Sequence, residues 1–390
     1  MKSIVLITNI LTPYRATFYS QYFNACQKYG IKFHVLCMAE TEPERNWYYN
    51  EYSSTFTTLM KGKTFNVFGI MTHYNPQTLD YIKNLSPDIL LMAGSYMFLS
   101  NWIAIFRKNT LHCPIIYWNE SHKNSIRTYN NLSLKIRELI RKVIFKRIDG
   151  FWYGGKMSLD FVKDYAAQDA KFYFMPNLID NSLYETVSKV SEEKRYEIKQ
   201  SLQITNDKIV FICPARLTFV KGIHTFMDLL YKASNKNKCT ILIPGDGDME
   251  NSLKEKAKKL ALDCRFLGYK VQSEMINLYK AADIFLMPSL SDPNPLTCIE
   301  ALWCGLPLLV STHVGNYPEV IKPGLNGFVF DYNKPDEAIQ KIETIIAKPK
   351  EWRDSAKKIS KEIAENTYNP KTVIDNSIKQ FIQDWDTRKK

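Results

Sequence analysis

The strongest constraint on the fold is an alternation of short apolar runs with helical patterns, which occurs twice along the chain. A charged and polar stretch at 185–205 separates the two series. From 335 to the end, only helical patterns remain. Alternation of this kind predicts βαβ units with parallel strands. The apolar runs are 3–10, 32–38, 88–94, 114–119 and 150–155, then 208–215, 239–245, 264–268, 283–289, 306–311 and 327–331.

The two series predict an α/β protein with two Rossmann-like, doubly wound parallel-sheet domains that face a central cleft. The first domain is expected at 1–190 and the second at 191–369. A helix at about 370–390 is expected to pack back on the first domain. In open parallel sheets, ligands bind beyond the carboxyl ends of the strands, so the loops there are the place to look for a site.

Composition and charge narrow the class of protein. The chain of 390 residues is 45% hydrophobic and 13% aromatic, which is typical of a globular protein and large enough for two cores. Its 8 cysteines are scattered without ligand spacing, so we expect free buried thiols and no metal or disulfide framework. The net charge of +12 indicates an anionic partner, and the absence of any nucleic-acid-binding motif excludes nucleic acid.

The first apolar run is cut off by Pro13, which makes it short for an export signal. No segment reaches the roughly 20 apolar residues needed to span a bilayer. We therefore expect a cytoplasmic protein that is neither exported nor integral to a membrane.

The segment SLSDPNPLTCIEALWCGLPLLVS (289–311) reads as a strand end, a loop and a helix. The helix is expected to begin near Pro295 with Asn294 as its N-cap, because Pro is favoured at the first helical position. The backbone N–H groups of Leu296 and Thr297 would then form an anion site suited to a phosphate.

Two carboxylates accompany this helix. Glu300 lies about one and a half turns in and could reach a hydroxyl beside the phosphate, and Asp292 in the loop could reach further along the same ligand. The alternative is structural: Asp292 and Asn294 would only make turn and cap bonds, and Glu300 would be a solvated helix residue.

A second loop in the same domain carries paired cations. In CPARLTFVKG (213–222), Arg216 and Lys221 follow a strand, and Gly222 opens the next helix. Two cations at the carboxyl end of a strand can clamp a diphosphate, although taken alone such a pair is more often surface charge. Both loops lie on the same edge of one predicted sheet, which favours a shared site.

The second half of the chain resembles the retaining glycosyltransferases of family 4, which have the GT-B architecture. The match runs in order through Arg216 and Lys221, through the carboxylate pair Asp292 and Glu300, and through the segments 244–260, 266–289 and 315–330. In the first half the match is looser, through the first strand and loop and through MPNLIDNSLYE (175–185).

The resemblance implies roles for individual residues. Arg216 and Lys221 would hold the donor diphosphate and neutralise the departing nucleotide. Glu300 would bind the ribose, Asp292 would contact the transferred sugar, and the backbone near Tyr269 would border the base. The resemblance also implies retention of anomeric configuration and no metal or other cofactor, with a saccharide or lipid-linked acceptor on the first domain.

Three departures from the family pattern leave the donor sugar open. Asp292 is one methylene shorter than the usual Glu, and Pro295 stands where the family commonly has Gly. The first loop, ILTPYRATF, lacks the frequent paired glycines, so Arg15 could take over a phosphate contact. After 114–119, either Glu120 or His122 could take the place of the family's sugar-facing histidine; Glu120, which directly ends the strand, is the choice here.

The segment 133–147 reads as a basic helix with Ile136, Ile140, Val143 and Ile144 on one face. It is either a core-packed helix with a solvated basic face or a docking surface for an anionic cytoplasmic leaflet. The whole pattern favours a nucleotide-sugar-dependent glycosyltransferase of bacterial cell-surface polysaccharide synthesis, of the O-antigen or capsule type. A nucleotide-sugar epimerase or hydrolase and a non-catalytic nucleotide-sugar-binding protein remain the alternatives.

Overall fold

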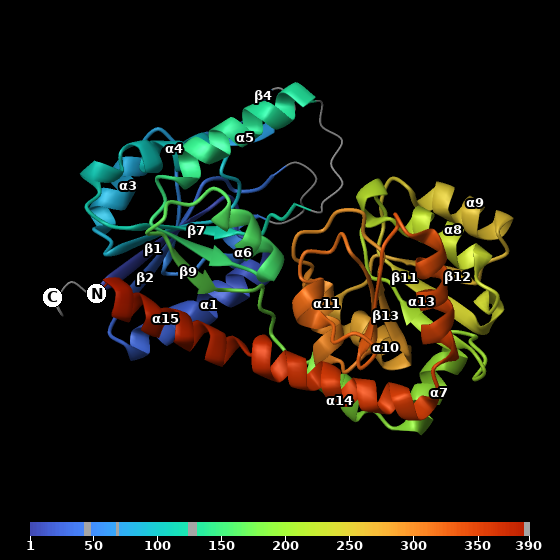
Figure 1. The fold of residues 1–390 in the computed structure, drawn as a ribbon. Helices are drawn as coiled ribbons and strands as arrows, with labels where there is room; N and C mark the ends of the chain where they lie inside the picture. The colour runs from blue at the N-terminus through green and yellow to red at the C-terminus, as the bar shows by residue number, and fades with distance from the viewer. Residues whose placement is uncertain (43–47, 68–69, 124–130, 386–390) are drawn as a thin grey trace. The chain divides into compact units, whose positions relative to one another are not determined.

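The computed structural model describes the chain except residues 43–47, 68–69, 124–130 and 386–390 (Figure 1). It divides into two compact units. The first comprises 1–121, 128–179 and 370–390, and the second comprises 122–127 and 180–369. Within the described part of the chain, no helix combines the length and the apolar character needed to cross a membrane.

The first unit is built on a parallel sheet of seven strands in the order β3-β2-β1-β6-β7-β8-β9. The order reverses between β1 and β6, as in a doubly wound sheet. Every strand predicted for this half is present. The strands are β1 (Ser3–Thr8), β2 (Lys32–Cys37), β3 (Thr57–Leu59), β6 (Ile89–Met92), β7 (Ile115–Asn119), β8 (Gly150–Tyr153) and β9 (Lys171–Phe174).

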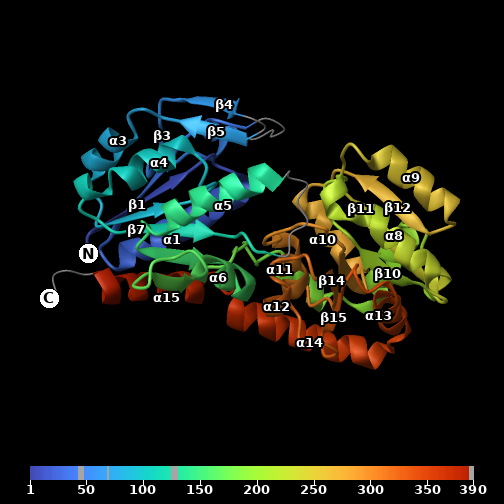
Figure 2. The same ribbon diagram turned by 45° about the horizontal axis from the view of Figure 1, so that its top comes forward.

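Four strands of this unit were not predicted. β3 and β9 form the two edges of the sheet, and β4 (Lys63–Val67) pairs with β5 (Ile70–Tyr74) in a separate antiparallel hairpin (Figure 2). Edge strands of three or four residues are too short to show a period, and their residues here are largely polar or half-exposed. The sequence therefore carried no strand signal at these places.

Helices cover the sheet, and the last one comes from the far end of the chain. α15 lies along α1 in Figure 1, and Ile378 and Phe381 belong to the same core as β1. The ring of Phe381 stacks on Trp152 at a centroid distance of 5.8 Å. The helices of this unit are α1 (Pro13–Lys28), α2 (Tyr49–Tyr52), α3 (Thr78–Leu85), α4 (Leu99–Phe106), α5 (Asn131–Phe145), α6 (Lys156–Lys163) and α15 (Pro370–Trp385).

The predicted apolar face of α5 is only partly in the core. Ile144 is buried and Ile140 is half-buried, whereas Ile136 is 50% exposed and Val143 is 43% exposed. Leu139, which was not on the predicted face, is 64% exposed. The side of the helix that contacts the core is that of Ile144 and Phe145, and it overlaps the predicted face only at its C-terminal end.

The second unit contains a parallel sheet of six strands in the order β12-β11-β10-β13-β14-β15. The chain reverses direction across the sheet between β10 and β13, so these two strands flank the switch point where ligands of such sheets bind. All six strands were predicted. They are β10 (Ile209–Ile212), β11 (Cys239–Pro244), β12 (Cys264–Gly268), β13 (Ile284–Met287), β14 (Leu308–Ser311) and β15 (Gly327–Phe330).

The main segment of this unit begins at 180, eleven residues before the start expected at 191. The reason is the short 3-10 helix η2 (Tyr184–Lys189), which packs on α10 and α11. Figure 2 shows α8 and α9 side by side on this sheet. The helices are α7 (Glu192–Ser201), α8 (Ile223–Lys232), α9 (Glu250–Lys259), α10 (Gln272–Ala281), α11 (Leu296–Trp303), α12 (Tyr317–Val320), α13 (Pro335–Ala347) and α14 (Lys350–Thr367).

All 8 cysteines are free, and all but the half-buried Cys264 are buried, as the scattered spacing predicted. Burial raises the pKa of Cys213, for example, to about 12. The prediction of two parallel-sheet, Rossmann-like domains is confirmed.

Candidate functional site

The loops that follow β10 and β13 pack against each other at the switch point of the second sheet. The N–H of Leu290 donates to the carbonyl oxygen of Val220 at 2.8 Å. Gly222, which precedes α8, has a φ of +66°, and a Cβ on it would lie 2.1 Å from the carbonyl oxygen of Pro288. Only glycine fits this close approach, so the position fixes how the two loops meet.

A single ion pair joins the two predicted site loops. Lys221 Nζ lies 2.5 Å from Asp292 Oδ2, and both side chains are mostly buried. The backbone of Asp292 is fixed as well, because its N–H donates to the carbonyl of His313 at 3.3 Å and its carbonyl accepts from the N–H of Gly315 at 2.8 Å. The Asp292 carboxylate therefore orients the Lys221 ammonium, which has three N–H donors in all.

Arg216 stands in the same loop as Lys221 but differs in its surroundings. Its side chain is exposed, and among the described residues the guanidinium makes no ion pair or side-chain hydrogen bond. The loop around it is ordered by the backbone, since the N–H of Leu217 donates to the carbonyl of Asp246 at 2.6 Å. The guanidinium of Arg216 therefore presents N–H donors from an ordered loop, where they can bind an anion.

The helix α11 begins one residue later than predicted. Its N-cap is Pro295, with an extended ψ of 127°, and Leu296 is the first helical residue. Asn294 is therefore not the N-cap; it is buried in the loop before the helix. Because no side chain caps this end, the amides of Leu296 and Thr297 remain among the N–H groups that an anion can accept from.

Glu300 lies on α11 beside two tyrosines rather than in solvent. Its Oε2 accepts a hydrogen bond from the hydroxyl of Tyr279 at 2.7 Å, and Tyr184 packs edge-on against Tyr279 at 6.0 Å. Burial raises the pKa of Glu300, although hydrogen bonds from Tyr279 and Tyr184 oppose the shift. The structural alternative for Glu300, a solvated helix residue, is therefore wrong.

A third loop was matched in sequence but given no site residue. It follows β11, and Gly245 and Gly247 pack it onto the Arg216 loop: added Cβ atoms would lie 1.9 Å from the carbonyl oxygen of Ala215 and 2.5 Å from that of Leu217. The Gly245 N–H also donates to the carbonyl of Gly268 at 2.8 Å, just before Tyr269. Tyr269 itself is 71% exposed.

His122 and Glu120 are placed in different parts of the molecule. His122 falls in the second unit, where its Cδ2 would lie 2.8 Å from a Cβ on Gly315. Glu120 belongs to the first unit and pairs with Arg15 at 3.3 Å. The Arg15 guanidinium also lies over the Trp118 ring, 3.9 Å from its centroid. The unit that contains Asp292 includes His122 and not Glu120, and the choice of Glu120 for the sugar-facing place stays a prediction.

The arrangement in the second unit gathers side-chain cations and backbone N–H donors at the carboxyl end of the sheet. It combines the Arg216 guanidinium, the Lys221 ammonium and the first amides of α11, with Glu300 placed for a hydroxyl partner. No group of three or more His, Cys, Asp or Glu side chains that could hold a metal ion occurs in the described ranges.

Comparison with known proteins finds a family match within the second unit. Residues 194–366 match the family model described as glycosyl transferases group 1. The matched range contains Arg216, Lys221, Asp292 and Glu300, whereas Arg15 and Glu120 of the predicted site lie outside it.

The curated relatives that this chain matches are distant. An uncharacterized glycosyltransferase of Methanocaldococcus jannaschii is 28% identical over 160 residues, which are 40% of this chain and 41% of that protein. The alpha-monoglucosyldiacylglycerol synthase of Streptococcus pneumoniae is 26% identical over 292 residues, 70% of this chain and 62% of that protein. The chain thus spans about half the length of the curated relatives it matches.

The fold comparison covers the whole chain. The crystal structure of HepE from Anabaena in complex with UDP and glucose aligns with a TM-score of 0.69 at 16% identity, over 98% of this chain and 100% of that chain. This likeness confirms the predicted GT-B fold.

Proposed function

We propose that this protein is a retaining glycosyltransferase of the hexosyl-transferring type. It would move a sugar from a nucleotide diphosphate sugar to a saccharide or lipid-linked acceptor in the synthesis of a cell-surface polysaccharide. The observation that carries the proposal is the Lys221–Asp292 pair, which fixes a cation beside the exposed Arg216 and the uncapped start of α11 at a sheet switch point.

Each part of this site has a task in the reaction. Breaking the bond between the sugar and the diphosphate develops negative charge on the leaving group, and fixed cations and helix amides stabilise that charge. Arg216 and Lys221 supply the cations, and the amides of Leu296 and Thr297 supply the dipoles. Because these groups are held before the reaction starts, little reorganisation opposes the step.

The other contacts complete the donor site. Glu300 would bind a ribose hydroxyl, and the exposed Tyr269, next to the Gly245–Gly268 backbone bond, would border the base. Asp292 would contact the transferred sugar, and the choice between Glu120 and His122 for a further sugar contact stays open. HepE was crystallised with UDP and glucose, which makes UDP the first nucleotide to test here.

The reaction is proposed to need no metal. The charge of the leaving group is matched by side-chain cations and backbone amides, so no Lewis acid is required to neutralise it. Retention of configuration follows if the acceptor attacks from the face that the diphosphate leaves, and the departing phosphate oxygen can then take the acceptor proton.

The exposed apolar stripe of α5 is proposed to dock on an anionic bilayer, where lipid-linked acceptors reside. Ile136, Leu139 and Val143 are exposed at spacings of three and four residues, so they share one side of the helix. Cations flank them, and the Arg147 guanidinium lies 5.2 Å from the centroid of the exposed Phe106 ring. Apolar residues beside cations suit the boundary between headgroups and acyl chains. The flanking cations are Lys135, Lys142, Lys146 and Arg147.

One experiment separates the proposed reaction from its alternatives. The protein is incubated with UDP-, GDP- and dTDP-sugars and a panel of lipid-linked and free saccharides, and nucleotide release and glycoside formation are both measured. Acceptor-dependent formation of an α-linked product from an α-linked donor is expected. Nucleotide release that is independent of every acceptor would indicate a hydrolase, and binding of nucleotide without any turnover would indicate a non-catalytic protein.

A further inference from the structure

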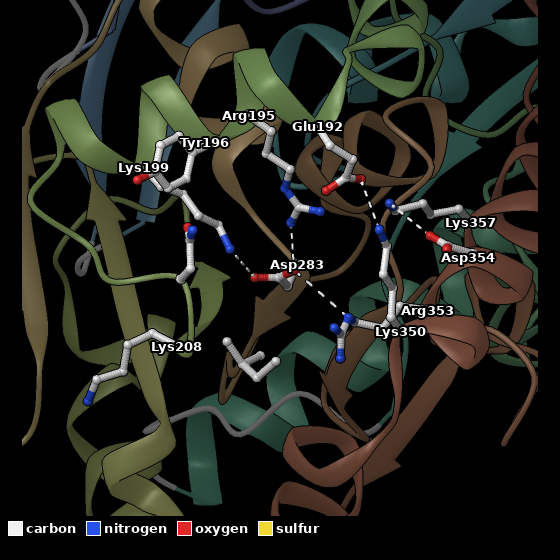
Figure 3. Close-up of a pocket in the computed structure, with 12 residues that line it drawn as sticks. Glu192, Arg195, Tyr196, Lys199, Lys208, Asp283, Lys350, Arg353, Asp354 and Lys357 are labelled. Atoms are coloured by element: carbon white, nitrogen blue, oxygen red, sulfur yellow. Dashed lines mark hydrogen bonds and ion pairs between the residues drawn. The ribbon is translucent and has the colours of Figure 1, made fainter.

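A second basic pocket lies in the second unit, at the amino-terminal ends of the strands whose carboxyl ends carry the donor loops. It has a volume of about 380 Å³ and is framed by α7, by the start of α14 and by the first residues of β10 and β13 (Figure 3). Since the donor loops follow the carboxyl ends of β10 and β13, the four residues of β13 separate the two places by about 13 Å of strand.

The pocket has more positive than negative charge. Its lining contains six cations against three carboxylates. Asp283, just before β13, is the only one of these carboxylates that is buried. The six cations are Arg195, Lys199, Lys208, Lys350, Arg353 and Lys357.

Asp283 is already satisfied by a few of these partners. Arg195 donates to its Oδ1 at 2.6 Å, and Lys199 donates to its Oδ2 at 3.0 Å. The backbone N–H of Val210 adds a bond to Oδ2 at 2.9 Å. These bonds account for Asp283, Arg195 and Lys199, and not for Lys208, Lys350 or Lys357.

The cations are held close together without enough counter-charge. Arg353 Nε lies 3.9 Å from the same Asp283 carboxylate, so three cations share one buried anion (Figure 3). The Nε–H of Arg195 is buried and has no hydrogen-bond partner within the described ranges. Burial lowers the pKa of Lys199, and the neighbouring Arg195 and Arg353 add to that shift while Asp283 opposes it.

The charged side chains at the rim of the pocket form only weak, exposed ion pairs. Lys350 Nζ is 3.7 Å from Glu192, and Lys357 Nζ is 3.3 Å from Asp354; both lysines are at least 31% exposed. Exposed pairs of this kind contribute little to stability, so their cations can turn to a ligand at small cost. Tyr196 adds an exposed aromatic ring to the same lining.

We propose that this pocket binds a phosphorylated small molecule of at least two negative charges, at a site separate from the donor site. Arg195, Lys199 and Arg353 form its floor, and Lys350 and Lys357 close on the phosphates from α14. The volume falls in the range of small-molecule sites, and the six cations among its twelve lining residues fit a phosphate ester rather than a lipid chain.

The test uses inorganic pyrophosphate and isothermal titration calorimetry on the full chain. The donor-site variant R216A/K221A serves as the background, so that any remaining binding reports on this pocket. Pyrophosphate is expected to bind this background with a stoichiometry of one. Adding K350E/K357E should then weaken binding at least a hundredfold, because two charge-assisted contacts are replaced by repulsion, each worth roughly tenfold.

Three controls make the outcome decisive. The variant K350R/K357R keeps the charges and should retain binding, whereas K254E/K258E on the exposed face of α9 should change nothing. Unchanged thermal unfolding of the background with K350E/K357E shows that the fold is intact. The proposal is overturned if pyrophosphate does not bind the background, or if K350E/K357E binds it as tightly. If the donor assignment were wrong, R216A/K221A would bind pyrophosphate as the unaltered chain does. K350E/K357E would still remove one pyrophosphate site in that case.

Discussion

Lys221 and Asp292 form an ion pair of 2.5 Å between loops that are 71 residues apart in the sequence. The pair joins the carboxyl ends of β10 and β13, the two strands at the switch point of the second sheet. It places a fixed ammonium group where an anionic ligand of such a sheet binds. The first predictions concern this pair and the backbone that supports it.

Removing a cation is expected to weaken diphosphate binding while the fold survives. Lys221→Ala and Arg216→Ala should each raise the Kd for UDP about tenfold to a hundredfold, since a hydrogen bond to a charged group contributes roughly 1.5–3 kcal/mol. Calorimetric titration measures the effect. Lys254→Ala, which removes an exposed lysine from α9, is the matched control and should bind normally. Unchanged affinity in both donor-site variants would refute the assignment.

Glycine at 222 is expected to be essential to the packing of the loops. In Gly222→Ala, the new Cβ would meet the Pro288 carbonyl at 2.1 Å, so the backbone must shift. The control is Gly324→Ala, where φ is +77° but nothing lies within 4 Å, so only the left-handed strain of about 1–2 kcal/mol applies. Urea unfolding should show a larger loss for Gly222→Ala, and only that variant should lose UDP affinity.

The half-buried Glu300 is expected to give a pH-dependent stability. Burial raises its pKa in the folded chain above the ordinary value of 4.5, so its favourable contribution is complete below pH 4.5 and is lost as pH rises through the raised pKa. Glu300→Gln should therefore be more stable than the unaltered chain at neutral pH and lose that advantage below pH 4.5, while its UDP affinity falls.

Glu343 supplies a comparison of opposite sign. Its carboxylate accepts from the backbone N–H of Ser234 at 2.7 Å, which lowers its pKa. Its favourable contribution is present above the ordinary pKa and is lost as pH falls, so Glu343→Gln should not stabilise the protein at neutral pH. Unfolding curves of both variants between pH 4 and pH 7 measure the difference. Parallel pH profiles for the two would contradict the account of Glu300.

Chelation is expected to leave the reaction unchanged. Turnover measured after treatment with EDTA, with and without added Mg²⁺ or Mn²⁺, should stay within the error of the assay, because cations of the chain serve the leaving group. A loss of turnover that Mg²⁺ or Mn²⁺ restores would show that a metal takes part.

Bilayer docking through α5 makes two separable predictions. Replacing Ile136, Leu139 and Val143 by Ser should abolish co-sedimentation with vesicles that contain phosphatidylglycerol. Replacing Lys142 and Lys146 by Ala should weaken it about tenfold or more, at roughly 1 kcal/mol for each cation, and the loss should shrink at high salt. Leu325→Ser, an equally exposed apolar residue of the second unit, is the control. Equal binding to neutral and acidic vesicles would rule out the electrostatic part.

The sequence was most informative where the structure is most regular. The buried strands of both sheets were predicted because their apolar runs are four to six residues long and bounded by helical patterns. Arg216, Lys221, Asp292 and Glu300 were singled out because each follows a strand of the same sheet, or lies on the helix after it. Topology alone brings such residues to one edge.

Other features depend on contacts that no local pattern contains. The pairing of Lys221 with Asp292 and the burial of Glu300 against Tyr279 and Tyr184 arise between distant segments. The start of α11 shifted by one residue because Pro295 fits the extended N-cap position as well as the first turn. For α5, periodicity identified an apolar side but could not say how much of it the sheet would cover.

The C-terminal helix completes the core of the first unit, since Phe381 stacks on Trp152 and Ile378 is fully buried there. During translation, that helix is made only after the whole of 180–369. The core of the first unit therefore stays incomplete until α15 has been synthesised. In the second unit, nearly all of 180–369 has been synthesised once α14 has been made. The first unit is thus begun before the second unit, but its core can be completed only after that of the second unit.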